Sequence, residues 1–406
     1  MKKFKLGMFV ALFVSLISVV TPVSAAAYTP SKVQSKSAMM VDAKTGQVIA
    51  SKNGNKSYPI ASLSKMIVIY MIEQKISKHE LSHSTKVAIP KKIAKFSQNT
   101  QVANVPLSSK KKYTIQQLEV AALLPSSNSA AMMLAHLVAG NQKKYYAKAG
   151  KLLDSWGISD SSIVSASGLP NSDMGEFADE SLIDGAENEM SAREIAIIAR
   201  HLITDYPNIL NYTELATAPF PGPNGGVQSI RNTDKLLGNK YYKFKGVKTG
   251  ITSKELTNFV GYTTIKGRPV ITVILNSKPG NGCFVDTLKL LTETDKNTTL
   301  GNLPTKQKMN IVNAKTPKGD VTLKSTNNSQ MFIANSDSVN LRSKAKPIDS
   351  NTKAPIKKGK VLMKEKVAFS DSDLNDYLGK QPTINYAAQE DIGKVNFFTA
   401  MFRQIF

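Results

Sequence analysis

Short apolar runs alternate with polar turns along the first three quarters of the chain. Five of these runs have the length of β-strands: 37–42, 47–50, 243–248, 257–264 and 269–276. The first two runs flank a turn that contains Gly46, and the last two flank Gly267, so each pair predicts a β-hairpin. Strands at both ends of this region indicate an antiparallel sheet.

A buried helix is predicted to begin near Ser62. Pro59 precedes this position and the apolar run Met66–Ile72 follows it. Residues three apart lie on one face of a helix, so the Ser62 hydroxyl and the Lys65 amine can meet there. A lysine held partly out of water can remove the serine proton and make the hydroxyl a nucleophile. An N-cap serine followed by a solvated lysine is the alternative interpretation.

Two more helices are predicted over residues 114–139, with a turn between them. The first ends at Pro125, and Ser126, Ser127 and Asn128 occupy the turn. Another helix is predicted after a capping box, in which a serine is followed three residues later by a glutamate, at Ser191 and Glu194.

These helices and strands together predict an α/β (α+β) domain with an antiparallel sheet over residues 28–300. From residue 306 the pattern changes to short apolar runs separated by Asn, Ser, Lys, Gly and Pro. That pattern predicts a small all-β accessory domain over residues 301–385.

The C-terminal segment 386–406 is predicted to form an amphipathic helix. Its apolar residues recur at helical spacing at Ile392, Val395, Phe398, Phe402 and Ile405. Such a helix is too short to span a bilayer, and we expect it to lie in the membrane interface. A helix docked on the protein's own surface is the alternative.

Residues 1–27 have the layout of a secretory signal peptide. Lysines at positions 2, 3 and 5 precede the apolar run Leu6–Val20, and small residues follow at 24–27. We expect cleavage and export, with the mature protein at the outer face of the cytoplasmic membrane, on the cell-wall side. An uncleaved N-terminal anchor is the alternative.

The composition and charge of the chain limit the kinds of molecule that we expect it to bind. The chain has 406 residues, 41% of them hydrophobic, which is enough for two or three domains with cores of their own. Its net charge of +23 comes mostly from dispersed lysines. No nucleic-acid-binding motif accompanies them, so anionic wall polymers or lipid headgroups fit better than nucleic acid. The single cysteine, Cys283, permits no intramolecular disulfide, and we expect it to be buried.

Two further motifs accompany Ser62-x-x-Lys65 along the chain. They are Ser126-Ser127-Asn128, in the predicted turn, and Lys248-Thr249-Gly250, at the end of the predicted strand 243–248. Each is common alone, but the three in this order are typical of penicillin-binding proteins and class A β-lactamases.

The chain resembles the low-molecular-weight penicillin-binding proteins, which are secreted serine D-alanyl-D-alanine carboxypeptidases. Residues 61–66 are similar to the family's Ala-Ser-x-Thr-Lys-Met, with Ser64 in place of the usual threonine. Residues 246–252 are similar to its Gly-x-Lys-Thr-Gly-x-Thr. The order of signal peptide, β-rich domain and amphipathic tail also matches, so the resemblance covers nearly the whole chain.

The resemblance implies a serine penicillin-binding catalytic fold and assigns roles to three residues. Ser62 would attack the carbonyl between the two terminal D-alanines of a peptidoglycan stem pentapeptide and form an acyl-enzyme. Lys65 would be the general base, and Ser126 would pass a proton to the leaving amine. Water would then release the shortened peptide, which limits cross-linking of the wall.

The same resemblance assigns substrate binding to the remaining motif residues. Asn128 would hold the substrate amide, and Lys248 and Thr249 would bind the terminal carboxylate. Gly250 would let the substrate backbone approach the strand. β-Lactam antibiotics would be ligands of the same site.

Several other functions stay open at this point. A class A β-lactamase needs a glutamate in a Glu-x-x-Leu-Asn element, and residues 129–247 contain none. A DD-transpeptidase or endopeptidase would use the same acyl-enzyme, and a non-catalytic wall-binding protein is the remaining alternative. No cofactor is implied. The four histidines show no ligand spacing, so we predict no metal site.

Overall fold

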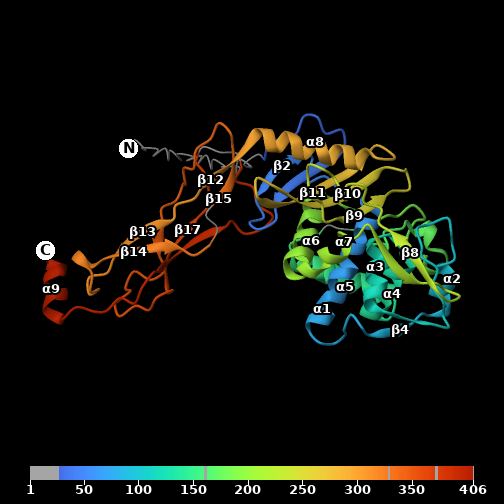
Figure 1. The fold of residues 1–406 in the computed structure, drawn as a ribbon, viewed down its shortest axis with the longest axis horizontal. Helices are drawn as coiled ribbons and strands as arrows, with labels where there is room; N and C mark the ends of the chain where they lie inside the picture. Colours follow the sequence, from blue (N-terminus) through green and yellow to red (C-terminus); the bar gives the residue numbers. More distant parts are fainter. Residues whose placement is uncertain (1–26, 160–161, 328–329, 371–373, 406) are drawn as a thin grey trace, which may run out of the picture.

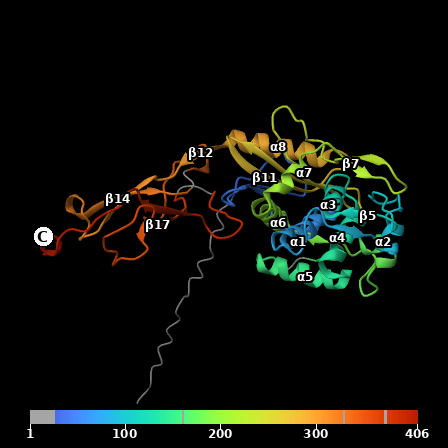
Figure 2. The same ribbon diagram turned by 60° about the horizontal axis from the view of Figure 1, so that its bottom comes forward.

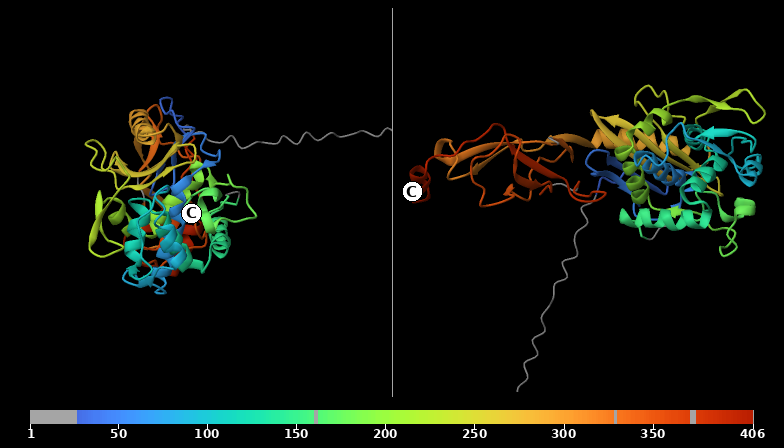
Figure 3. Two further views of the ribbon diagram at one scale, coloured as in Figure 1. Left: turned by 90° about the vertical axis from the view of Figure 1, so that its right-hand side faces the viewer. Right: turned by 90° about the horizontal axis from the view of Figure 1, so that it is seen from below.

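The computed structural model describes residues 27–159, 162–327, 330–370 and 374–405. The predicted signal peptide lies outside these residues, apart from Ala27. A larger part with helices and a sheet is followed by a slender β-rich part that extends away from it (Figures 1 and 3). This arrangement agrees with the predicted α/β (α+β) class with an additional all-β region.

A five-stranded antiparallel sheet forms the centre of the larger part, in the order β2-β1-β11-β10-β9. Its strands are β1 (Ser37–Asp42), β2 (Val48–Lys52), β9 (Val247–Ile251), β10 (Thr257–Ile265) and β11 (Arg268–Ser277). Both predicted hairpins are present, because β1 pairs with β2 and β10 pairs with β11. Strand β9 lies at one end of the order, so only one of its edges pairs within this sheet.

The prediction of a strand over 243–248 was wrong at both ends. Strand β9 begins at Val247, because Gly246 has a φ of 94° and interrupts the extended backbone before it. Lys248, Thr249 and Gly250 therefore lie inside the strand and not at its end.

Helices cover both faces of the sheet. Helix α8 (Gly282–Asn297) packs against β10 and β11, and α6 (Ala192–Asp205) packs against β1 and β11 from the other side. Helix α1 (Lys65–Ser77) lies beyond α6 and contacts α4 (Asn128–Ala139). Figure 2 shows α8 and α5 (Gln142–Ser155) on opposite sides of this part.

Local sequence explains where the helices begin. Helix α3 (Ile115–Leu123) starts at a capping box formed by Thr114, and the predicted capping box of Ser191 and Glu194 opens α6. Helix α1 is buried at every residue from Lys65 to Glu73, and the residues between these two are apolar or aromatic, so it has no solvent-facing polar side over this stretch. Burial on all sides fixes the position of this helix inside the core.

Shorter elements complete the larger part. The strands are β3 (Tyr58–Pro59), β4 (Lys86–Ala88), β5 (Lys112–Thr114), β6 (Glu189–Met190), β7 (Thr217–Pro221) and β8 (Val227–Arg231). The helices are α2 (Lys91–Phe96) and α7 (Leu210–Thr213), with 3-10 turns at Ala61–Ser64, Asn171–Phe177 and Pro207–Ile209.

The β-rich part contains a second five-stranded sheet in the order β13-β14-β18-β17-β16 and a pair formed by β12 and β15. The strands are β12 (Thr298–Asn302), β13 (Lys306–Asn310), β14 (Asp320–Ser325), β15 (Gln330–Ala334), β16 (Lys346–Pro347), β17 (Val361–Lys366) and β18 (Thr383–Ala388), with a 3-10 turn at Pro317–Gly319. Its buried apolar residues, from Leu303 to Ile392, form a core separate from that of the first sheet.

Polar contacts join the two parts. The buried Gln47 side chain donates to the carbonyl oxygens of Phe332 and Leu374, at 2.8 and 2.9 Å, and accepts from the Phe332 amide. Arg193 forms an ion pair with Asp376. Phe332 and Leu374 also belong to the apolar cluster that surrounds α8. The β-rich part is therefore anchored to the sheet at the α8 end.

The C-terminal helix is shorter than predicted. Helix α9 comprises Phe397–Ile405, whereas residues 383–388 form β18. Ile392 pairs with Ile356 and is only 5% exposed, so it belongs to the core of the β-rich part and not to the helix. The prediction that Ile392 and Val395 belong to the helix was therefore wrong, because both lie before the first residue of α9. Phe406 lies outside the described residues.

Helix α9 lies at the tip of the β-rich part, far from the first sheet (Figures 1 and 3). Within the described ranges, no helix has the length and apolar character needed to cross a membrane.

Candidate active site

Ser62 lies in a 3-10 turn, Ala61–Ser64, that leads directly into α1. The predicted helix start at Ser62 is thus a tighter turn, in which residues three apart lie one above the other. Lys65, the first residue of α1, brings its Nζ within 2.7 Å of the Ser62 Oγ. The turn therefore produces the Ser–Lys contact that the spacing predicted.

Lys65 is fully buried, and its amine hydrogen-bonds to three neutral oxygen atoms of the described residues. Besides the Ser62 hydroxyl, its Nζ donates to the Asn128 Oδ1 at 2.7 Å and to the Ser167 carbonyl at 2.6 Å. Burial, and secondly the charge of Lys248, hold the pKa of Lys65 well below its ordinary value. A neutral amine has two N–H donors and one lone pair. The two carbonyl oxygens can take the donors, which leaves the lone pair for the Ser62 proton.

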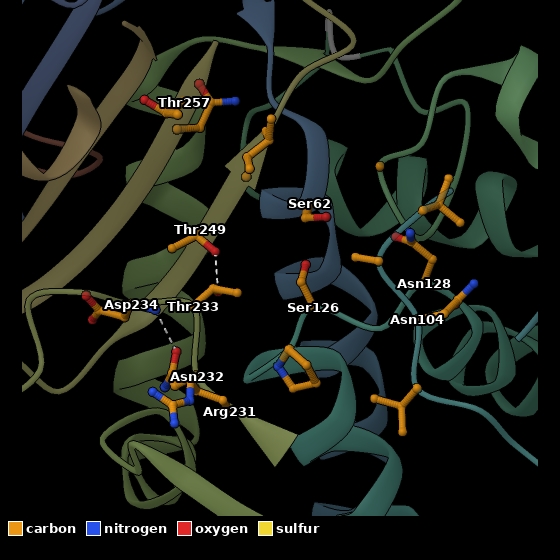
Figure 4. A pocket seen from close by; sticks show the side chains of 18 of the residues that line it. Ser62, Asn104, Ser126, Asn128, Arg231, Asn232, Thr233, Asp234, Thr249 and Thr257 are labelled. Carbon is orange, nitrogen blue, oxygen red and sulfur yellow. Dashed lines mark hydrogen bonds between the residues drawn. The ribbon is translucent and has the colours of Figure 1, made fainter. Parts of the chain in front are cut away.

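Ser126 and Asn128 face the cleft from opposite ends of one short segment. Between them, Ser127 caps α4 by accepting from the Ala130 amide, so its side chain points into the protein. Ser126 has a φ of 65°, which is rare for a serine. Its buried Oγ has no hydrogen-bond partner among the described residues. Figure 4 shows the Ser126 hydroxyl pointing toward Ser62.

Strand β9 supplies the opposite wall of the site. Lys248 is 1% exposed, and burial lowers its pKa to about 7, although the nearby Asp234 acts in the other direction. Burial also raises the pKa of Asp234 to about 6. The Thr249 hydroxyl lies 2.6 Å from that of Thr233 (Figure 4). This wall therefore presents a hydroxyl pair with a buried amine behind it.

Gly250 allows β9 to pack closely against the Ala61–Ser64 turn, named the nucleophile turn after the predicted nucleophile Ser62. A Cβ atom at this position would lie 2.9 Å from the Ile60 carbonyl oxygen and 3.3 Å from the Ser62 amide nitrogen. A side chain would push the strand away from Ser62, so glycine sets the width of the site.

The predicted site residues lie together around one open cleft with a volume of about 1190 Å³. Ser62, Ser126, Asn128, Thr249 and Gly250 line it, whereas Lys65 and Lys248 are buried behind its walls. Arg231 and Lys235 also line the cleft and add positive charge to it.

The segment of Ser167 and Gly168, which packs against the nucleophile turn, was not predicted from the sequence. The Ser167 carbonyl accepts from Lys65, and the following Gly168 has a φ of 83°. A Cβ on Gly168 would lie 1.9 Å from the Ala61 carbonyl oxygen, so no other residue fits. A glycine in an otherwise polar loop was the signal available in the sequence.

Asn188, Thr233 and Asp234 were missed as well. The Asn188 Nδ2 donates to the Ser64 Oγ at 2.7 Å and to the Ser165 carbonyl at 2.7 Å, which ties the nucleophile turn to the Ser167 segment. Nothing in one sequence distinguishes these residues from ordinary loop residues, because their contacts come from distant parts of the chain.

The catalytic part matches a known family. The model of the S11 peptidases, described as D-alanyl-D-alanine carboxypeptidase, matches residues 23–279. The chain belongs to this family, and it is a serine-type D-alanyl-D-alanine carboxypeptidase of the penicillin-binding protein class.

Individual relatives agree with this assignment. The chain is 24% identical over 383 residues to the D-alanyl-D-alanine carboxypeptidase DacA of Haemophilus influenzae, covering 91% of this chain and 88% of that protein. It is 28% identical over 293 residues to a D-alanyl-D-alanine endopeptidase of Pseudomonas aeruginosa, covering 69% and 85%.

A solved structure resembles most of the chain. The crystal structure of a peptidoglycan synthesis regulatory factor (PBP3) from Streptococcus pneumoniae aligns with a TM-score of 0.76 at 27% identity. The alignment covers 89% of this chain and all of that one, so it includes the β-rich part.

We predict that Gly168→Ala displaces the nucleophile turn. The new Cβ would collide with the Ala61 carbonyl, and a shift of about 1 Å at Ser62 should slow acylation by penicillin on the order of 100-fold. The control is Gly157→Ala, because Gly157 has a similar φ of 79° but nothing within 4 Å of its Cβ position. The acylation rates of both variants, measured by labelled penicillin, are compared. Equal rates would show that the close packing at Gly168 does not position Ser62.

Proposed function

We propose that Ser62 is the nucleophile and that neutral Lys65 is its general base. The observation that carries this proposal is the 2.7 Å contact between the Ser62 Oγ and a fully buried Lys65 Nζ whose other contacts are neutral oxygens. Lys65 takes the Ser62 proton as the Oγ attacks the carbonyl carbon between the terminal D-alanines. The backbone N–H of Ser62 stabilises the negative charge that develops on the carbonyl oxygen.

Collapse of this intermediate breaks the C–N bond and leaves an ester on Ser62. The proton held by Lys65 passes through the Ser126 hydroxyl to the leaving D-alanine amine. Ser126 suits this role because its Oγ faces Ser62 and has no hydrogen-bond partner in the described part of the chain. Water then attacks the ester, with Lys65 again as the base, and releases the shortened peptide.

Residues of β9 and its neighbours bind the substrate. The Thr249 hydroxyl contacts the terminal carboxylate, and the positive charge of Lys248 attracts it from behind the wall. Arg231, which lines the cleft near Thr233, adds a second charge on this side (Figure 4). The unpaired edge of β9 pairs with the peptide backbone, as in strand addition, and Asn128 holds the substrate amide from the other wall.

An endopeptidase activity on cross-linked peptides is a second candidate. The cleft is open, and one relative of 28% identity is a D-alanyl-D-alanine endopeptidase. A cross-linked dimeric stem peptide tests it: cleavage into monomers at a rate comparable with pentapeptide trimming would favour the endopeptidase.

We predict that Ser62→Ala abolishes both pentapeptide trimming and penicillin acylation. The matched control is Ser229→Ala, which removes an exposed hydroxyl on β8 that also lines the cleft. Both activities should be retained in this variant. Mass spectrometry follows the loss of one alanine from a stem pentapeptide and the penicilloyl adduct on the protein. An adduct on Ser62→Ala protein would contradict the assignment of the nucleophile.

The pH dependence of the reaction should follow the two buried lysines. Lys65 must be neutral, so activity rises with pH, and its lowered pKa places this rise well below the ordinary range of lysine. Lys248 must be charged, and its pKa of about 7 means that substrate binding weakens as the pH rises further. The profile of kcat/KM should therefore be bell-shaped.

Asp234→Asn tests the alkaline limb of this profile. Asp234 raises the pKa of Lys248, so its removal should move the alkaline limb to lower pH. The control is Asp173→Asn, which removes an exposed carboxylate that also lines the cleft. An alkaline limb that moves to higher pH, or that moves equally in the control, would contradict the role of Lys248.

We further propose that the protein acts at the outer surface of the cytoplasmic membrane and that α9 binds the membrane. The Arg403 guanidinium donates to the carbonyl oxygens of Val312, Ala314 and Thr316, which fixes the helix to the β-rich part on one side. Phe397 and Phe398 are each 75% exposed on the helix. Aromatic side chains that face away from the protein favour the membrane interface. The net charge of +23 favours anionic lipid.

The double variant Phe397→Ser/Phe398→Ser should weaken vesicle binding. Each phenylalanine contributes about 1.5–3 kcal/mol on burial, so affinity should fall at least about tenfold. The control is Val227→Ser/Tyr241→Ser, because these residues are 76% and 89% exposed on the larger part. Co-sedimentation with phosphatidylglycerol-containing vesicles measures the effect. Unchanged binding of the phenylalanine variant would contradict the membrane role of α9.

A further inference from the structure

Glu73, His83 and Glu119 form a cluster beside the second half of α1, away from Ser62, which precedes the start of this helix. Glu73 lies two turns after Lys65 on α1, Glu119 lies on α3, and His83 lies in the loop that follows α1. One possible ligand atom from each residue lies within 4.8 Å of the others. The spacing of these residues in the sequence does not reveal the cluster, because the fold brings them together.

Glu119 is the unusual member. Its side chain is fully buried, and neither carboxylate oxygen has a hydrogen-bond partner among the described residues. A buried carboxylate without a hydrogen-bond donor is costly. The mechanism proposed for the cleft uses none of these three residues. A positive charge placed between the three side chains would offset the free-energy cost of burying the Glu119 carboxylate.

We propose that this cluster binds one divalent metal ion of the zinc type. The His83 Nε2 lies 2.9 Å from the Glu73 Oε1 and 3.7 Å from the Glu119 Oε2. Ligands about 2.0–2.2 Å from a tetrahedral zinc ion stand roughly 3.3 Å apart, so these distances bracket the required spacing. One imidazole with two carboxylates favours Zn²⁺ over Mg²⁺ and Ca²⁺, which prefer all-oxygen sites.

The residues around the cluster hold the His83 loop in place and leave a path for an ion from solvent to the carboxylates. The loop that carries His83 is fixed to the start of α3, because the amides of Ile115 and Gln116 donate to the carbonyl oxygens of Thr85 and His83. The His83 side chain is 34% exposed, whereas Glu73 and Glu119 are 9% and 0% exposed. An ion can therefore enter past His83 and reach the buried carboxylates. Water would complete the coordination, as in zinc sites with three protein ligands.

A bound ion would join the two helices that present the catalytic residues. Helix α1 begins at Lys65, and α3 leads through Pro125 to Ser126. Linking Glu73, in the second half of α1, to Glu119, in the middle of α3, would hold these two helices at a fixed distance. The role assigned to the ion is stability of this scaffold and not chemistry in the cleft.

The test uses full-length protein purified without a histidine tag and treated with a chelator. Isothermal titration with ZnCl₂ should show one Zn²⁺ per chain, and Mg²⁺ or Ca²⁺ should not compete. The Tm should rise by about 5 °C or more at a hundredfold excess of Zn²⁺ over its Kd. His83→Gln and Glu119→Gln should each weaken binding at least about tenfold, whereas His136→Gln, on α4 outside the cluster, should bind normally.

Glu119→Gln also separates metal binding from general damage. The amide has the same shape without the buried charge, so the metal-free variant should be at least as stable as metal-free wild type while losing the zinc-dependent rise in Tm. Absence of stoichiometric zinc binding, or unchanged binding by both cluster variants, would overturn the proposal. The cluster would then be a carboxyl pair that shares a proton beside His83.

Discussion

The burial of Lys65 among neutral oxygen atoms is the constraint on which the rest of the site depends. A lysine amine in water is protonated at neutral pH and cannot accept the proton of a serine. Here the amine is enclosed by the Ser62 hydroxyl, the Asn128 amide oxygen and the Ser167 carbonyl, with no carboxylate among these three contacts to hold the charged form. Each contact comes from a different segment, so the whole catalytic part must fold before the base exists.

The central sheet and the buried helix fix this arrangement. Helix α1 is surrounded by apolar neighbours, which leaves it no freedom to shift, and the 3-10 turn before it sets Ser62 above Lys65. Strand β9 approaches the turn closely because Gly250 has no side chain, and Gly168 supports the turn from the other side for the same reason. Two glycines therefore allow the close packing around the Ser62 turn.

Much of the fold could be predicted from the sequence, because hairpins and capped helices depend on local patterns. The hairpins around Gly46 and Gly267 and the capping box at Ser191 are all present. The predicted ends of helices and strands were wrong where tertiary contacts determine where the element begins. Gly246 delays β9, and burial in the β-rich core removes Ile392 from the C-terminal helix.

The site residues fall into the same two groups: those that short local patterns reveal and those that only the fold brings together. Its three motifs were found because each is a short local pattern, and the structure places all seven predicted residues around one cleft or directly behind its walls. Asn188 and Asp234 were missed, because they act on Ser64 and Lys248 across long sequence separations. The Glu73–His83–Glu119 cluster was missed for the same reason.

A direct titration of the Lys65 amine tests the central claim. Protein labelled with ¹³C at the lysine Cε is followed by NMR as the pH is raised, and Lys65→Arg and Lys248→Arg variants identify the two buried signals. The account predicts that the Lys65 signal changes well below the pH at which the exposed lysines titrate. A Lys65 signal that titrates with them, near the ordinary lysine pKa of about 10.4, would contradict it.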